Sequence, residues 1–226
     1  LISYIQRLCG YFLTGEVSEH ILPVFHGEGN NGKSTLLGVL QSLLGIDYAG
    51  KAAPEVVVKK KREEHSTVIA DLHGLRLAYS EETGQGDRLA ESLVKDLTGG
   101  SAIKARRCKE DLWQFQPTHK LVLATNNKPV ISGTDHGIWR RIKLVPFEVK
   151  IPPEEVDKDL GIKLEKELSG ILNWCLKGCQ DWLANGLMEP PIVNAATESY
   201  RSDSDLIGEF LDEYCIISDG CVTRAT

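Results

Sequence analysis

The sequence lacks the features of a membrane protein, of a disulfide-stabilised secreted protein and of a uniformly basic nucleic-acid coat. No apolar stretch approaches the roughly 18–20 residues needed to cross a bilayer, and no signal peptide is present. The six cysteines form no C-x-x-C pair, so reduced thiols are the simplest interpretation. The net charge of −6 means that any contact with nucleic acid is local. We therefore expect a cytoplasmic globular protein.

Other kinds of chemistry are also missing. The six histidines fall in no metal-ligand spacing, and Cys175 and Cys179 have no matching pair elsewhere, which favours core packing over a zinc site. Neither a Ser-His-Asp set nor a G-x-S-x-G motif occurs. The 226 residues suffice for one α/β domain with a small helical appendage. Because the chain starts at Leu1 and stops abruptly at Thr226, we expect it to be a piece of a larger polypeptide.

A glycine-rich loop is the most informative motif that is present. Residues 27–35 read G-E-G-N-N-G-K-S-T, which matches the pattern G-x-x-x-x-G-K-[ST]. A short apolar run precedes the motif. Apolar residues at helical spacing follow it and predict a helix that ends near Gly45. Such a loop turns backbone N–H groups and a helix N-terminus towards a phosphate. Lys33 is expected to reach the β- and γ-phosphates, and Ser34 to hold Mg²⁺. The predicted ATP-binding residues are Gly27, Gly29, Asn30, Asn31, Gly32, Lys33, Ser34 and Thr35.

An apolar strand over residues 74–82 ends in two carboxylates, Glu81 and Glu82. ATPases use one acid at such a strand end for the Mg²⁺ shell and a neighbouring acid to polarise the attacking water. We assign Glu81 to the metal and Glu82 to the water, but the order stays open because sequence alone does not fix the end of a strand. A solvated acidic turn is the alternative.

A third apolar strand, residues 120–125, leads into Asn126 and Asn127. An amide at the tip of a buried strand beside the phosphate loop is suited to hydrogen-bonding the γ-phosphate or the water. Asn126 is the first candidate for this sensor and Asn127 the second, while a simple Asn-Asn-Lys-Pro turn is the alternative.

Two arginines, Arg140 and Arg141, stand just before a further apolar strand. A guanidinium that reaches the γ-phosphate of a neighbouring subunit stabilises transition-state charge in ring ATPases. A surface salt-bridge site is the alternative for this pair.

The order of these motifs resembles the superfamily 3 helicases, most closely the D5-like helicase domain of phage and plasmid primases of the P4 type. The resemblance also rests on Thr98-Gly99-Gly100 and on Trp139-Arg140-Arg141, and it spans roughly residues 1–150. It implies an AAA+-like core with ATP and Mg²⁺, assembled as a ring, usually a hexamer, that translocates on single-stranded DNA. It further implies a primase or primase-polymerase region on the same full-length chain and a bacterial or archaeal host cell.

A basic cluster lies between the acidic strand and the Asn strand. Residues 101–115 read as two strands about a turn near residues 110–111, and the resemblance places a hairpin here that projects into the ring's channel. Side-chain alternation lets only some of its cations face the channel together. A charged edge strand is the alternative, and Trp113 and Phe115 are expected to pack in the core. The predicted DNA-binding residues are Lys104, Arg106, Arg107 and Lys109.

The chain thus divides into an N-terminal helical lead-in (1–20), a P-loop ATPase core (21–150) and a helical C-terminal extension (151–226). The extension is predicted to hold an amphipathic helix over residues 160–176, a break at residues 190–191 and a further helix over residues 206–214. The predicted function is an ATP-dependent DNA helicase motor of phage, prophage or plasmid replication. The alternatives are a P-loop nucleotide or small-molecule kinase and a nucleotide-controlled DNA-binding scaffold.

Overall fold

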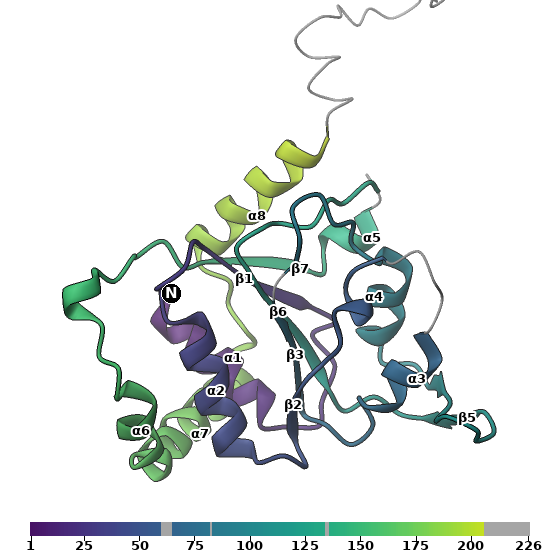
Figure 1. Cartoon of the computed structure of the whole chain (residues 1–226), viewed down its shortest axis with the longest axis horizontal. Coiled ribbons are helices and arrows are strands. Elements are labelled where there is room, and N and C mark those ends of the chain that lie inside the picture. Colours follow the sequence, from purple (N-terminus) through teal and green to yellow (C-terminus); the bar gives the residue numbers. More distant parts are fainter. Residues whose placement is uncertain (60–64, 82, 134–135, 206–226) are drawn as a thin grey trace, which may run out of the picture.

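The computed structural model describes residues 1–59, 65–81, 83–133 and 136–205, which form an α/β fold. A parallel sheet lies between two layers of helices (Figure 1). The fold class predicted from the alternation of strands and helices is therefore confirmed. Within the described ranges no helix combines the length and the apolar character needed to span a membrane.

All pairings in the five-stranded sheet are parallel, in the order β2-β3-β6-β1-β7. In β1, which lies between β6 and β7, Val24 is opposite Leu123 on one side and Leu144 on the other. All five carboxyl ends therefore share one edge, where open α/β sheets bind their ligands. The strands are β1 (Leu22–His26), β2 (Ala49–Lys51), β3 (Leu77–Glu81), β6 (Lys120–Thr125) and β7 (Ile142–Pro146).

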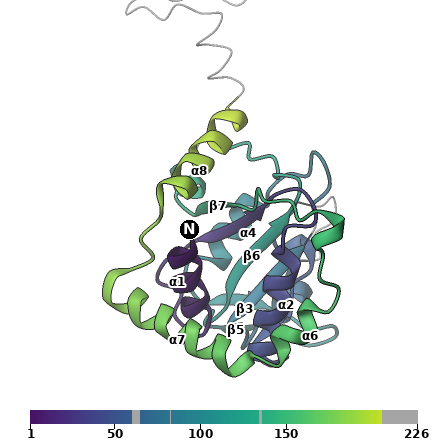
Figure 2. The ribbon, with the colours of Figure 1, turned by 90° about the vertical axis from the view of Figure 1, so that its left-hand side faces the viewer.

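Both faces of the sheet are buried, which explains its apolar strands. Alternate residues along a strand enter two different cores: Phe25 packs on the side of α1, α2 and α7, whereas Val24 packs on the opposite side. Figure 2 shows these three helices in front of the sheet. They are α1 (Ile2–Phe12), α2 (Lys33–Leu44) and α7 (Leu168–Asn185).

The second face is covered by short elements. Among them, β4 and β5 form a separate antiparallel hairpin directly before β6 (Figure 1). The two-stranded turn predicted for residues 101–115 is therefore present. These elements are η1 (Pro54–Val56), α3 (His65–Ala70), α4 (Glu91–Leu97), β4 (Ile103–Ala105), β5 (Trp113–Phe115) and α5 (His136–Trp139).

The end of the chain differs in part from the prediction. The single helix predicted over residues 160–176 is two helices, because α6 (Leu160–Glu165) ends before α7 begins. A helix not predicted from sequence, α8 (Pro191–Ser204), follows the proline break directly, with Pro191 at the first helical position, where proline is favoured. The short η2 (Pro153–Glu155) precedes α6. The helix predicted over residues 206–214 lies outside the described residues.

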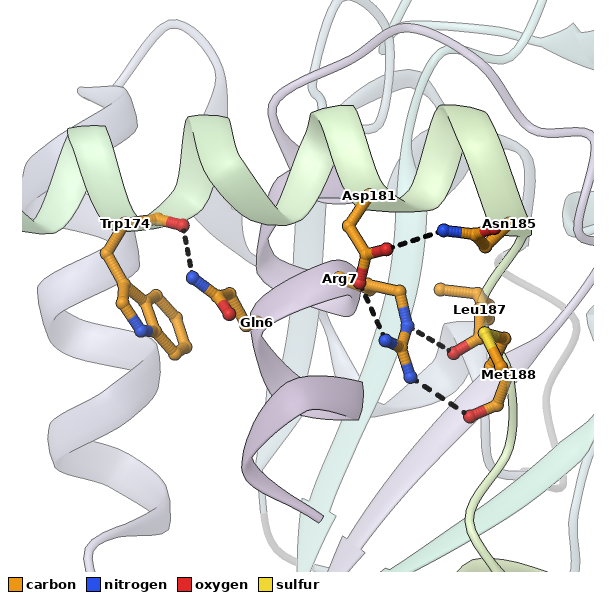
Figure 3. Close-up of polar contacts among 7 residues, drawn as sticks. All are labelled: Gln6, Arg7, Trp174, Asp181, Asn185, Leu187 and Met188. Atoms are coloured by element: carbon orange, nitrogen blue, oxygen red, sulfur yellow. Dashed lines mark hydrogen bonds and ion pairs between the residues drawn. The ribbon is translucent and has the colours of Figure 1, made fainter.

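Helices α1 and α7 approach to backbone contact. A Cβ atom at Gly10 would lie 2.1 Å from the backbone nitrogen of Cys179, so only glycine permits this approach. The Arg7 guanidinium then joins the two segments (Figure 3): it donates to an Asp181 carboxylate oxygen at 2.7 Å and to two backbone carbonyls beyond the end of α7, those of Leu187 and Met188. The N-terminal helix is thereby held against the C-terminal helices, on the α2 side of the sheet.

Candidate nucleotide-binding site

The glycine-rich loop connects the carboxyl end of β1 to the first turn of α2. Gly32 has φ +86° and Asn30 φ +60°, so both lie in the left-handed region that glycine adopts freely and asparagine tolerates. A Cβ atom at Gly27 would lie 2.1 Å from the carbonyl oxygen of Phe147. The strand, loop and helix expected from the sequence are therefore present, with glycine where the backbone requires it.

Lys33 stands at the centre of the loop with its side chain buried. Its ammonium donates to the carbonyl oxygen of Gly27 at 2.5 Å and to the side-chain oxygens of Asn31 at 3.0 Å and Asn126 at 3.1 Å. Burial lowers the pKa of Lys33. These three hydrogen bonds hold the Lys33 ammonium within the loop, where a phosphate oxygen would be a stronger partner.

Asn31 ties the loop to the segment after β7. Its amide nitrogen donates to the carbonyl oxygens of Glu28 and Phe147, the latter at 3.0 Å. The Phe147 ring packs on Phe25 of β1 with centroids 5.3 Å apart. The loop is therefore supported by two neighbouring strands.

The two asparagines after β6 have different partners. Asn126 reaches the Lys33 ammonium, as described above. The Asn127 amide instead donates to the carbonyl oxygen of Thr83 at 3.1 Å, and the buried Thr83 and Thr125 hydroxyls lie 2.7 Å apart. Asn126 thus faces the loop, whereas Asn127 fastens the segment after β3 to the end of β6. The sequence ranked Asn126 first for the sensor, but it did not predict the structural role of Asn127.

Glu81 at the end of β3 forms an ion pair, with its Oε2 2.8 Å from the Lys51 ammonium at the end of β2. Lys51 was not among the residues predicted for the site. Glu82, the second predicted acid, lies outside the described residues.

Lys33, Glu81 and Asn126 line one cavity of about 330 Å³ at the carboxyl edge of the sheet. The size lies at the lower end of the range for small-ligand sites. Its walls are the loop from Gly29 to Thr35, Glu81 and residues 124–126. Ser34 and Glu81 both line it and carry the oxygen donors that Mg²⁺ prefers. Among the described residues no group of three or more His, Cys, Asp or Glu forms a metal site, but Mg²⁺ beside phosphates needs only one or two protein ligands.

The arginine pair lies away from this cavity. Both residues precede β7, and the carbonyl oxygen of Arg141 accepts from the backbone nitrogen of Leu22, at the start of β1. They therefore occupy the amino-end edge of the sheet, opposite the loop. The buried Arg141 guanidinium donates to the Thr98 hydroxyl at 3.1 Å and to the carbonyl oxygen of Gly137 at 2.6 Å, whereas Arg140 is exposed. Of the two, only Arg140 is placed to reach a second molecule.

The Thr98-Gly99-Gly100 segment has a structural role. Besides accepting from Arg141, Thr98 offers its carbonyl oxygen to the His20 ring nitrogen at 2.8 Å. Gly100 follows with φ +77°. The segment joins the end of α4 to the connection before β1 and to the start of β7, three elements that are distant in sequence.

The basic cluster surrounds the β4–β5 hairpin and also lies apart from the cavity. Lys104 is exposed on β4 between the buried Ile103 and Ala105, as alternation requires. Trp113 and Phe115 pack against the His73 ring with centroids 4.8 and 5.2 Å away, so their predicted packing role is supported. The remaining cations of the cluster are exposed in the connection between the strands: Arg106, Arg107 and Lys109.

A family of unknown function, DUF5906, has a model that matches residues 25–141 of this chain. The match begins in β1 and ends at Arg141, so it contains the loop, Glu81, Asn126 and the hairpin.

Several viral proteins are similar to the chain over most of its length. "Putative helicase L207/L206" of Acanthamoeba polyphaga mimivirus is 30% identical, with 96% of this chain and 24% of that protein covered. "Putative helicase 022R" of Frog virus 3 is 26% identical, with 93% and 23% covered. "Putative primase C962R" of African swine fever virus is 25% identical, with 92% and 24% covered. The chain thus spans about a quarter of the length of these relatives.

Among solved structures, the A-form apo structure of the NrS-1 C-terminal region superposes with a TM-score of 0.65. The match covers 92% of this chain and 49% of that one at 12% sequence identity. At this identity the likeness concerns the fold alone.

Proposed function

This chain belongs to the family of unknown function DUF5906, and we propose that it is the ATP-hydrolysing motor of a DNA helicase that acts in replication. The viral relatives named as helicases and primases support a role in replication. The observation that carries the proposal is the meeting of Lys33, Asn126 and Glu81 in one polar cavity at the glycine-rich loop. A phosphate-binding lysine, a strand-end acid and a strand-end amide are the groups that phosphoryl transfer to water requires.

In the proposed reaction, the backbone N–H groups of the loop and the Lys33 ammonium bind the β- and γ-phosphates. Ser34 and Glu81 would hold Mg²⁺, which would neutralise charge on the phosphate oxygens. Glu82 accepts the proton of the attacking water, and Asn126 orients that water against the γ-phosphorus. The bond from the γ-phosphorus to the bridging oxygen breaks as the water adds, so that ADP and phosphate leave. The exposed Arg140 of one subunit completes the site of its neighbour, because its own loop lies at the opposite edge of the sheet.

The proposed assembly is a superfamily 3, AAA+-like ring, usually a hexamer, on the same full-length chain as a primase or primase-polymerase region. In such a ring, the exposed cations of the hairpin contact the phosphate backbone of single-stranded DNA without reading its sequence. Lys104, Arg106, Arg107 and Lys109 all lie outside the nucleotide cavity, so they are available for this contact. Nucleotide hydrolysis then moves the hairpins along the strand.

The test is unwinding of a fluorescently labelled DNA duplex with a single-stranded tail, using protein shown by light scattering to be assembled. We expect strand separation that requires ATP and Mg²⁺ and that Lys33→Ala abolishes. Assembled protein that binds the tailed duplex and hydrolyses ATP without separating its strands would contradict the helicase proposal. Transfer of phosphate to a nucleoside or other small molecule would instead support a kinase.

A further inference from the structure

A second and larger cavity lies beside the loop. It has a volume of about 630 Å³ and is bounded by the outer side of α2 and by the segment from Ile151 to Glu165. Helix α6, in that segment, lies next to α2 in both views (Figures 1 and 2). We propose that this cavity binds the base and ribose of the nucleotide whose phosphates occupy the loop. The inference rests on the proposed function, and it adds the part of the site that recognises the nucleoside.

Continuity between the two cavities supports this assignment. They share four residues, Asn30, Gly32, Ser34 and Thr35. A nucleotide whose phosphates lie in the loop therefore extends past Ser34 and Thr35 into the larger cavity. A third cavity of about 430 Å³ on the other side of the loop, bounded by Gly27 and Phe147, shares no lining residue with the phosphate cavity. Of these two cavities, the larger one is therefore the one that continues from the phosphate site.

The walls of this cavity suit a flat ring. On the segment after β7, the apolar side chains of Val156 and Leu160 remain 42% and 37% exposed, although a folded chain gains by burying them. On α2, Gly38 faces the cavity, and a Cβ atom built there meets no atom within 4 Å. A base seated between the helix surface at Gly38 and these two side chains covers apolar surface that the protein alone leaves in water.

The wall formed by the segment is fixed to the loop and to α2. The backbone nitrogen of Ile151 donates to the carbonyl oxygen of Asn30 at 2.8 Å, which joins the beginning of the segment to the phosphate loop itself. At its far end, the Ser42 hydroxyl lies 3.5 Å from a Glu165 carboxylate oxygen. The hydrogen bond from Ile151 thus holds the beginning of this wall against the loop, which lowers the ordering cost of base binding there.

Filling the cavity from Gly38 tests the proposal. A leucine on a helix extends towards the preceding turn, so the side chain of Gly38→Leu occupies the space next to Ser34 and Thr35. Leucine is also a better helix former than glycine, so the variant is expected to fold. Gly170→Leu is the matched control, because Gly170 also lies within a helix with open space around it but on α7, outside the cavity.

The measurement is calorimetric titration with MgATP and with Mg-tripolyphosphate, which carries the phosphates without the nucleoside. For Gly38→Leu we expect a dissociation constant for ATP at least about tenfold higher, which corresponds to about 1.4 kcal/mol and lies within the usual cost of overpacking. The dissociation constant for tripolyphosphate should stay within about twofold of wild type. Leu160→Ala should weaken ATP alone by about threefold or more through lost contact. Gly170→Leu should change neither ligand.

Two results would overturn this inference while leaving the proposed function intact. One is unchanged ATP binding by Gly38→Leu, and the other is equal weakening of ATP and tripolyphosphate, which would locate the effect in the loop. Wild-type protein that binds neither ligand would overturn the proposed function itself. Thermal unfolding of each variant accompanies the titrations, and the Leu160→Ala result decides the question if Gly38→Leu does not fold.

Discussion

The Lys51 ammonium lies 2.8 Å from Glu81 Oε2, so an ion pair joins the ends of β2 and β3 at the edge of the phosphate cavity. A carboxylate that holds Mg²⁺ in the proposed reaction is therefore also the partner of a lysine. The two cations compete for one side chain, because a strong contact of Glu81 with Mg²⁺ weakens its contact with Lys51.

Lys51→Met should therefore lower the Mg²⁺ concentration that gives half-maximal ATP hydrolysis. A half-exposed ion pair contributes up to about 1 kcal/mol, which corresponds to a shift of roughly two- to fivefold. The measurement is a Mg²⁺ titration of the hydrolysis rate at saturating ATP. Lys128→Met is a matched control, because Lys128 pairs with Asp203 and not with the site acid. An unchanged or higher Mg²⁺ requirement in Lys51→Met would contradict the competition.

The two neighbouring asparagines should separate catalysis from stability. Asn126→Ala removes the group that orients the water, so the hydrolysis rate should fall by about 10²-fold, while the lost hydrogen bond to Lys33 should cost at most about 1 kcal/mol of unfolding free energy. Asn127→Ala removes the hydrogen bond to Thr83 and should lower the free energy of unfolding by about 1 kcal/mol. Hydrolysis assays and urea denaturation of both variants check this. The opposite pattern would assign the sensor role to Asn127.

The two arginines should also differ in role, with Arg141 contributing to stability and Arg140 to hydrolysis. Arg141→Ala removes a buried guanidinium and its hydrogen bonds to Thr98 and Gly137, so we expect a loss of about 1.5–3 kcal/mol of unfolding free energy. Arg140→Ala should keep wild-type stability and slow hydrolysis by about 10³-fold, because it removes the arginine supplied to the neighbouring subunit.

Subunit mixing checks the direction of that contribution. Arg140→Ala protein mixed with Lys33→Ala protein brings intact loops next to intact arginines at some interfaces, so part of the lost activity should return. Mixtures no more active than the separate variants, in rings shown to exchange subunits, would contradict an Arg140 that acts in trans.

His119 should make the fold sensitive to acid. Its ring is buried, and in the described part of the chain neither ring nitrogen has a hydrogen-bond partner. Burial, with the nearby Lys120 charge, lowers the pKa of His119 to about 4. Between that value and the ordinary 6.5 the unfolded chain binds the proton more readily, so stability is lost as the pH falls through this window.

His119→Leu should remove that part of the pH dependence. Relative to wild type, its free energy of unfolding should increase by about 2–3 kcal/mol as the pH is lowered from 7 to 4. Urea denaturation at several pH values measures the difference, with the exposed His136→Leu as control. A constant difference between His119→Leu and wild type across this range would show that His119 titrates normally.

Features encoded in local sequence were the most predictable. The loop, the strand before it and the helix to Gly45 follow from glycine positions and apolar spacing within 25 residues. The hairpin follows in the same way from alternation on both sides of a turn. The break between α6 and α7 was not predicted, because the apolar spacing continues from Leu160 through Leu168 although the backbone turns between them.

Roles that depend on distant partners could not be predicted from the sequence. Thr98 is buried against Arg141, 43 residues away, and Asn127 bonds to Thr83, 44 residues away. Nothing in their own neighbourhood marks these residues as structural. The cavity between α2 and the segment after β7 likewise exists only once that segment has packed back on the helix.

Coupling of nucleotide hydrolysis to single-stranded DNA through the hairpin is what would make the proposed protein a motor. Its most direct test is the steady-state rate of ATP hydrolysis by assembled protein with and without single-stranded DNA, with Lys33→Ala as the blank. We predict strong stimulation by DNA that is lost when Lys104, Arg106, Arg107 and Lys109 are replaced together by glutamine, while the rate without DNA is unchanged. Lys33-dependent hydrolysis by an assembled ring that is indifferent to DNA would contradict this coupling.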